Sequence, residues 1–351
     1  MLLGIDEDAM KYRGILVNEG FSKLDVFNEE CSEIRDDCLF FLRLVKEYFE
    51  RRGILFVQPD SLGKGEMVDF AIDFEIPRRR ALNVKNRYLV RFECELIYPG
   101  SYIASRLAGY KKIFSWNNLA VNPGQFIKVN FPNKIVQVPT PSWGNRAKLC
   151  CMIASNKTVP HTSPLLLYSE RAETIRWFEQ HAPQDFDLFG SGWDTPLARH
   201  GLMWRLISKL QSRLPKLADQ VFFPSYRGTV VSKIETLQKY RFSICYENVR
   251  DLPGYITEKI FDSFFAGCIP VYWGASNIST YIPEECFIDR RQFNDCGELY
   301  RFMVCMTNSE YTCYQERIAT FLTSDRVKPF SAEAFADTVV NSIVGDLGIG
   351  A

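Results

Sequence analysis

The sequence predicts an α/β protein made of two Rossmann-like domains that face each other across a cleft. Apolar, strand-like segments alternate with helix-like segments, which favours parallel sheets covered by helices on both faces. This alternation runs twice, before and after a polar, proline-containing segment at 138–148, and a chain of 351 residues is long enough for two such domains.

The first run of alternation opens with a strand around 14–18. Between 38 and 52, apolar residues recur at intervals of three and four, which predicts a helix that Gly53 ends. Three further segments read as strands, at 54–57, 68–74 and 87–93.

The second run predicts strands at 149–155, 186–189, 240–248 and 268–274, with helices at 169–181 and 256–267. We therefore expect an N-terminal domain at 1–145, a C-terminal domain at 146–330, and a final segment, 331–351, whose helix packs back against the first domain. Ligands of open parallel sheets bind beyond the carboxyl ends of the strands, so functional side chains are expected there.

Charge and composition exclude several classes of protein. Lys and Arg together number 42, as do Asp and Glu, so bulk charge does not attract the chain to nucleic acid or anionic lipid. The N-terminus lacks the pattern of a secretory signal, and no window approaches the roughly 20 apolar residues of a membrane span. The 11 cysteines lack metal-site spacing, as do the 3 histidines. We expect a soluble, cytoplasmic protein without a bound metal, with peripheral membrane association left open.

The start of the predicted helix 256–267 carries an unexpected cation. Lys259 lies in the first turn, where the helix dipole favours negative charge. An anion bound at this helix N-terminus would resolve the conflict. The alternative is an exposed pair between Lys259 and Asp262, three residues apart.

The stretch around this helix, YRFSICYENVRDLPGYITEKIFDSFFAGCIPVYWGASN at 240–277, closely resembles the motif of glycosyltransferase family 10, the α1,3/4-fucosyltransferases. The segments 110–133 and 226–243, and the FGSGWD turn, are also similar to family members of the bacterial and viral type. This resemblance implies a GT-B fold, GDP-fucose as the donor, inversion at the anomeric carbon, an oligosaccharide or glycoconjugate acceptor, and no required metal or other cofactor.

The resemblance also implies roles for individual residues of the C-terminal domain. Lys259 and Arg171 would hold the diphosphate, and Tyr255 would pack on the nucleotide or bond to it. Asn248 and Glu258 would bond to ribose or sugar hydroxyl groups. Two further aromatic residues are weaker candidates for lining the nucleotide site, Trp193 and Tyr226.

The general base is expected at a strand end of the N-terminal domain. The segment RFECELIYPGSY resembles the acidic segment of the family and places the base at Glu93, with Glu95 as the alternative. If the strand continued, both carboxylates would share one face, and their proximity would raise the pKa of one of them.

Other functions stay open at this point. A related glycosyltransferase could use GDP-mannose or a UDP-xylose type of donor, because cations at a helix start would hold any nucleoside diphosphate. A catalytically silent module that binds a sugar or a nucleotide is a second alternative. A nucleic-acid partner is not expected, since basic and aromatic residues are not interleaved.

Overall fold

The computed structural model describes residues 10–19, 24–29, 35–63, 66–77, 84, 86–117, 124–136, 146–196 and 222–349. The chain divides into two compact units, the first formed by Met1–Ile135 and Val327–Ala351 and the second by Val136–Arg326. Most of the polar segment predicted to connect two domains, 138–148, lies outside the described residues.

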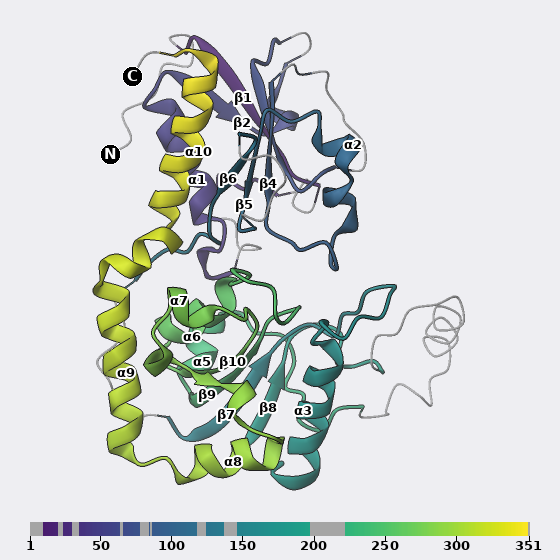
Figure 1. The fold of residues 1–351 in the computed structure, drawn as a ribbon, viewed down its shortest axis with the longest axis vertical. Coiled ribbons are helices and arrows are strands. Elements are labelled where there is room, and N and C mark those ends of the chain that lie inside the picture. Colours follow the sequence, from purple (N-terminus) through teal and green to yellow (C-terminus); the bar gives the residue numbers. More distant parts are fainter. Residues whose placement is uncertain are drawn as a thin grey trace. The chain divides into compact units, whose positions relative to one another are not determined.

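The first unit is built on a parallel sheet of six strands in the order β2-β1-β3-β4-β5-β6 (Figure 1). The strands are β1 (Tyr12–Val17), β2 (Ile54–Val57), β3 (Phe70–Phe74), β4 (Asn86–Arg91), β5 (Lys112–Ser115) and β6 (Phe126–Lys128). Helix α1 (Phe40–Glu50) connects the first two strands, and Gly53, with a φ of 71°, lies in the turn after it as the sequence predicts.

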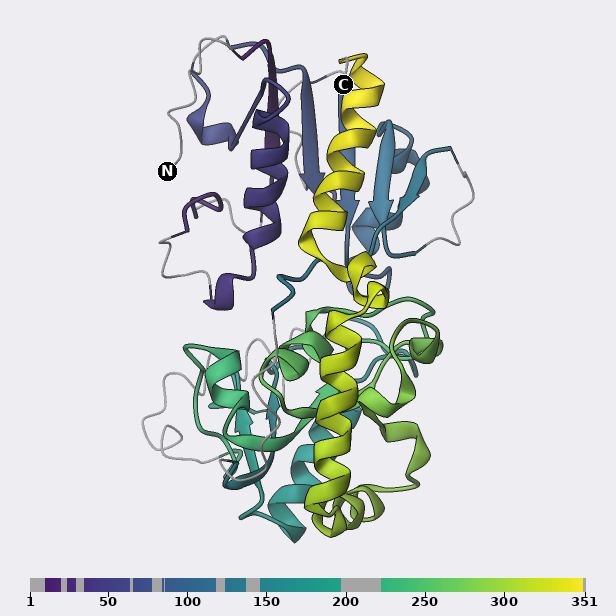
Figure 2. The same cartoon turned by 90° about the vertical axis from the view of Figure 1, so that its left-hand side faces the viewer.

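Alternate side chains of each strand serve the two faces of this sheet. Tyr88 and Val90 of β4 join the core on the side of α1, whereas Leu89 packs on the opposite side. The last helix, α10 (Ala332–Leu347), lies beside α1 in both views (Figures 1 and 2). Phe335 of α10 meets Phe41 of α1 edge to face, with ring centroids 5.5 Å apart. The C-terminal helix is therefore part of the first unit.

The second unit holds a parallel sheet of five strands in the order β11-β10-β9-β7-β8. Its strands are β7 (Lys148–Ile153), β8 (Phe186–Phe189), β9 (Tyr240–Tyr246), β10 (Ile269–Trp273) and β11 (Ile288–Asp289). Its helices are α3 (Tyr168–His181), α5 (Lys233–Leu237), α6 (Glu258–Phe265), α7 (Ile278–Tyr281), α8 (Cys296–Cys305) and α9 (Asn308–Thr323).

Strand order in the second unit identifies where a ligand would bind. The chain places β8 on one side of β7 and then returns to place β9 on the other side. The connections after β7 and β9 therefore leave in opposite directions, and ligands of open parallel sheets bind at such a switch point, beyond the carboxyl ends of the two strands. Helices α3 and α6 begin at this edge, so their first turns supply the candidate site.

Helix α6 forms where the sequence predicts a helix. Its apolar residues Ile260, Phe261 and Phe264 are buried, as expected for one face of an amphipathic helix. The Thr257 side chain accepts a bond from a backbone N–H of the first turn. No helix within the described part of the chain is both long and apolar enough to span a bilayer.

Candidate active site

Two loops of the second unit are tied together at the switch point between β7 and β9. The Leu167 N–H donates to the Asn248 carbonyl (3.0 Å), and the Arg250 N–H donates to the Leu165 carbonyl (2.8 Å). The loop that enters α3 is thus bonded to the loop that leaves β9. This contact brings the first turn of α3 next to the predicted site residues of β9.

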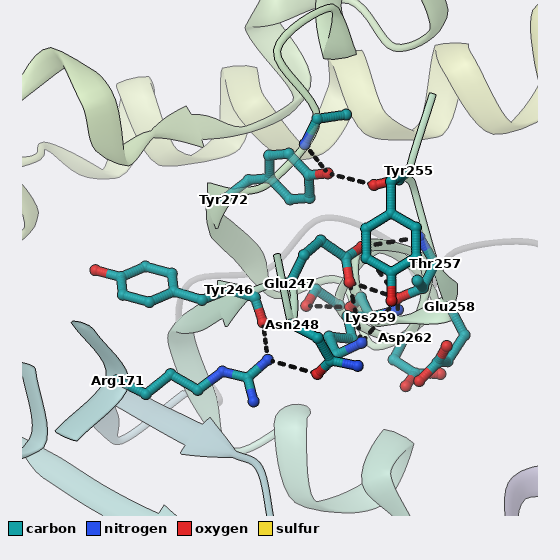
Figure 3. A network of polar contacts seen from close by, with 12 residues as sticks. Arg171, Tyr246, Glu247, Asn248, Tyr255, Thr257, Glu258, Lys259, Asp262 and Tyr272 are labelled. Carbon is teal, nitrogen blue, oxygen red and sulfur yellow. Dashed lines mark hydrogen bonds and ion pairs between the residues drawn. The ribbon is translucent and has the colours of Figure 1, made fainter. Parts of the chain in front are cut away.

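Arg171 lies in that first turn and is 4% exposed. Its Nη2 donates to the Tyr246 carbonyl (2.6 Å) and to Asn248 Oδ1 (3.1 Å), as Figure 3 shows. Burial lowers the pKa of Arg171, an effect that Tyr168 and Glu247 oppose. The structure therefore brings together two of the predicted site residues, Arg171 and Asn248, and fixes the guanidinium at the strand end.

Glu247 organises the start of α6 and is fully buried. Its Oε1 accepts from the Thr257 N–H (2.8 Å), and its Oε2 accepts from Thr257 Oγ1 (2.8 Å) and Lys259 Nζ (3.0 Å) (Figure 3). The helix dipole favours this carboxylate. The anion expected at the N-terminus of α6 is therefore supplied by the protein itself, as the carboxylate of Glu247.

Lys259 keeps its charge and part of its hydrogen-bonding capacity. Burial disfavours the cation, but Glu247 and then Glu258 outweigh it and raise the pKa of Lys259. The ammonium group has three donors, of which Glu247 and Thr257 (2.9 Å) accept two. The side chain is 25% exposed, so an anionic ligand can approach it.

Glu258 and Asp262 share a second cation, Lys233 of α5. Lys233 Nζ lies 2.7 Å from Asp262 Oδ2 and 3.9 Å from Glu258 Oε1. Burial acts to raise the pKa of Glu258, but Lys259 and Lys233 together lower it to about 2. Lys259 is paired with Glu247, and Asp262 with Lys233, which differs from the exposed Lys259–Asp262 pair considered from the sequence.

A tight contact at the end of β10 explains the glycine of the WGA sequence. A Cβ atom on Gly274 would lie 2.3 Å from Tyr272 Oη and 2.5 Å from Glu247 Cγ. The Tyr272 hydroxyl accepts from the Ala275 N–H (3.0 Å), which fixes the turn in this position. Only glycine lets the chain pass so close to the buried Glu247.

The three predicted aromatic residues are held inside the second unit. Tyr255 is 1% exposed, and Trp193 is buried against Phe223. Trp193 Nε1 donates to the Ala154 carbonyl (2.7 Å), and the Tyr226 hydroxyl donates to the Gly190 carbonyl (2.8 Å). These bonds fix the loops after β7 and β8. A contact of these residues with a nucleotide stays a prediction.

In the first unit, the prediction that a strand continues to Glu93 is wrong. Strand β4 ends at Arg91, because Glu75 Oε1 accepts from the N–H groups of both Phe92 and Glu93 (2.8 Å each). The chain then turns at 95–97. Glu93 is half-buried and Glu95 is exposed, so the shared face expected for the two carboxylates does not form.

Several residues that build these sites were missed from the sequence. Glu75 follows β3 directly, so inspection of every strand end would have found it. The contact between Lys233 and Asp262 joins two different helices and leaves no local pattern in the sequence. Among the described residues, no group of three or more His, Cys, Asp or Glu side chains is arranged to hold a metal ion.

Comparisons with known proteins agree with this geometry. The α-(1,3)-fucosyltransferase FucT of Helicobacter pylori is 36% identical over 69 residues, which cover 20% of this chain and 14% of that protein. The mouse 4-galactosyl-N-acetylglucosaminide 3-α-L-fucosyltransferase 9 is 36% identical over 85 residues, 23% of each chain. The chain therefore matches less than a quarter of the length of these relatives.

A solved structure resembles the fold of this chain over most of its length. An α-glucosyltransferase in complex with UDP and DNA aligns with a TM-score of 0.53 at 12% identity, over 95% of this chain and 99% of the other. With the two parallel-sheet units, this likeness confirms the predicted GT-B fold class. The model of glycosyltransferase family 10 (fucosyltransferase), C-terminal part, matches residues 143–323, more than half of the chain. The protein therefore belongs to glycosyltransferase family 10.

Proposed function

We propose that the protein is an inverting fucosyltransferase that moves L-fucose from GDP-fucose to a hydroxyl group of a glycan acceptor. The observation that carries this proposal is the cluster at the β7–β9 switch point of a family 10 domain, where Arg171, Asn248, Glu258 and Lys259 gather. Membership of the family and relatives named as fucosyltransferases support the donor.

The second unit would stabilise the leaving group. As the bond between fucose C1 and the β-phosphate oxygen breaks, its electron pair passes to GDP, and negative charge grows on the diphosphate. Lys259 and Arg171 are cations already fixed by protein contacts, so they need little reorganisation when this charge develops. Glu258 stays ionised and can accept hydrogen bonds from hydroxyl groups of GDP-fucose.

The first unit would supply the base. The acceptor oxygen attacks C1 from the side opposite GDP, which inverts the configuration there, and its proton passes to a carboxylate. We propose Glu93 for this role, with Glu95 as the alternative, because the backbone of Glu93 is held on both sides: Glu75 accepts its N–H, and the Tyr102 hydroxyl donates to its carbonyl (2.9 Å).

We propose a metal-independent reaction, in which Lys259 and Arg171 are the cations that stabilise the leaving group. Transfer should then persist after treatment with EDTA. A cytoplasmic location stays a prediction from the sequence.

Donor binding tests the proposal first. Isothermal titration should give the tightest binding for GDP-fucose among GDP-fucose, GDP-mannose and UDP-xylose, with GDP alone also bound. Incubation with GDP-fucose and a glycan array should then give a fucosylated product whose anomeric configuration is opposite to that of the donor. Tighter binding of a UDP-sugar would overturn the choice of donor, and donor binding without transfer or hydrolysis would favour a binding module.

A further inference from the structure

The end of strand β3 carries an acidic residue that the reaction above does not use. Glu75 follows the strand directly and has a φ of 55°, in the left-handed region that residues other than glycine rarely adopt. Its own N–H donates to the Val90 carbonyl of β4 (2.9 Å). This conformation turns the Glu75 side chain to the end of β4.

The Glu75 carboxylate accepts hydrogen bonds from two backbone N–H groups, that of the proposed base and that of the residue before it. Oε1 accepts from the N–H groups of Phe92 and Glu93, and the Ser101 side chain lies beside the same carboxylate. Burial raises the pKa of Glu75.

A second contact holds the other side of the same residue. The Tyr102 hydroxyl donates to the Glu93 carbonyl (2.9 Å), and Tyr102 belongs to the 3-10 helix η4 (Pro99–Tyr102). The Arg91 guanidinium stacks over the Tyr102 ring at 3.9 Å, which fixes that side chain in turn. The N–H and the carbonyl of Glu93 are therefore both hydrogen-bonded to side chains, those of Glu75 and Tyr102.

We propose that Glu75 is a positioning residue for the general base: it fixes the backbone of Glu93 and thereby the direction in which the Glu93 carboxylate meets the acceptor hydroxyl. This inference rests on the proposed function, in which Glu93 takes the proton. The sequence predicted Glu95 as the carboxylate beside Glu93. In the structure, the carboxylate bonded to the Glu93 backbone is that of Glu75.

The charge of Glu75 gives this role a second consequence. Where both are ionised, Glu93 and Glu75 repel each other, and among the described residues Arg91, Cys94, Glu95 and Tyr102 also lie in electrostatic reach of the pair. Removal of the negative charge at position 75 would make it easier for Glu93 to lose its proton. The acid limb of the pH profile of kcat/KM should then move to lower pH.

Two substitutions separate position from charge. Glu75→Gly deletes the carboxylate, and glycine adopts a φ of 55° without strain, so the fold loses little besides the contact. Glu75→Gln keeps an oxygen acceptor for the two N–H groups and removes the charge. Asp36→Gly is the matched control, because Asp36 is also an acidic residue of the first unit with a left-handed φ (50°).

Hydrogen exchange at the amides of Phe92 and Glu93 provides a readout that does not need activity. Glu75→Gly should abolish the protection of both amides, Glu75→Gln should retain most of it, and Asp36→Gly should leave it unchanged. In transfer assays, Glu75→Gly should lower kcat by about 10–100-fold through misplacement of the base, with an unchanged KM for GDP-fucose. Glu75→Gln should recover most of the rate and show the shifted acid limb.

Protected amides and a wild-type kcat in Glu75→Gly would overturn the inference, as would an equal loss of rate in the control. If Glu75→Gly does not fold, as judged by thermal unfolding, Glu75→Asn takes its place, because asparagine tolerates a left-handed φ and its side chain is too short to keep both bonds; protected amides with a wild-type kcat in that variant overturn the inference. If the wild-type protein transfers no fucose, the proposed function fails by itself. The exchange measurement then still decides whether Glu75 fixes the Glu93 backbone.

Discussion

The two strand-end sites hold their important residues in different ways. At the end of β9, two charged side chains of α6 are fixed by opposite charges: Lys259 by the buried Glu247, and Glu258 by Lys259 and Lys233. At the end of β4, the backbone of Glu93 is fixed by Glu75 and Tyr102. The difference suits the two roles, because cations for a leaving group need a set position and charge, whereas a base needs a set direction and a lone pair.

The largest expected effect concerns the strand end of the first unit. Glu93→Gln should lower kcat by about 10²–10⁴-fold, because the amide cannot take the acceptor proton. Glu95→Gln should have a smaller effect, since Glu95 is exposed in a turn whose backbone is not held in the same way. Initial rates with a fixed acceptor measure both. A larger loss of kcat in Glu95→Gln would assign the base to Glu95. The contact between Glu75 and the Glu93 backbone would then not position the base.

The next effect tests the paired charges of the second unit. Lys259→Met should lower kcat/KM for GDP-fucose by about 10²–10³-fold through loss of leaving-group stabilisation. It should also reduce the free energy of unfolding by about 3 kcal/mol, because Glu247 stays buried without its cation.

A double substitution separates these two losses. Glu247→Gln combined with Lys259→Met removes both charges, and the Gln side chain can still accept from Thr257. We expect urea unfolding to show recovered stability while activity stays low. Recovery of activity in the double variant would mean that Lys259 acts only to neutralise Glu247.

The same contrast explains what the sequence could predict. Three residues of the second site, Asn248, Glu258 and Lys259, lie within the motif at 240–277, so they could be placed at a strand end and a helix start from spacing. The predicted α6 and its apolar face are confirmed. The partner of Lys259 was not predicted, because spacing along a helix favours Asp262 and does not show that Glu247 is buried under the helix start.

The first site could be predicted only in outline. The strand that ends at Arg91 was found by its apolar residues, but its true end depends on Glu75, which is 18 positions before Glu93 in the chain. The alternation of apolar residues along β4 does not show that a side chain from elsewhere accepts hydrogen bonds from the N–H groups that follow the strand. A carboxylate within two residues of the end of each of two neighbouring parallel strands is the pattern that would have revealed it.

A smaller effect is expected at Arg171. Arg171→Lys should weaken GDP binding by about tenfold, because a single ammonium nitrogen that bonds to the Tyr246 carbonyl and Asn248 Oδ1, as Arg171 Nη2 does, leaves no second nitrogen to donate to the diphosphate. Arg176→Lys is the matched control, since Arg176 is on the same helix and pairs with Glu179. Isothermal titration with GDP measures both. Equal weakening in the two variants would mean that the loss comes from α3 as a whole.

The smallest effect is a dependence of stability on pH through Glu258. Its pKa is lowered from 4.5 to about 2 in the folded protein, so its ionised form stabilises the fold above pH 4.5 and this contribution disappears as the pH falls to about 2. The difference in free energy of unfolding between wild type and Glu258→Gln should be about 1 kcal/mol at neutral pH, since the side chain is partly exposed, and should vanish near pH 2. Lys233→Gln should raise the pKa of Glu258 and move this loss to higher pH. A difference that stays constant from pH 6 to pH 2 would show that Glu258 is not held by its two lysines, and the contrast between a site fixed by charges and a site fixed by its backbone would then fail.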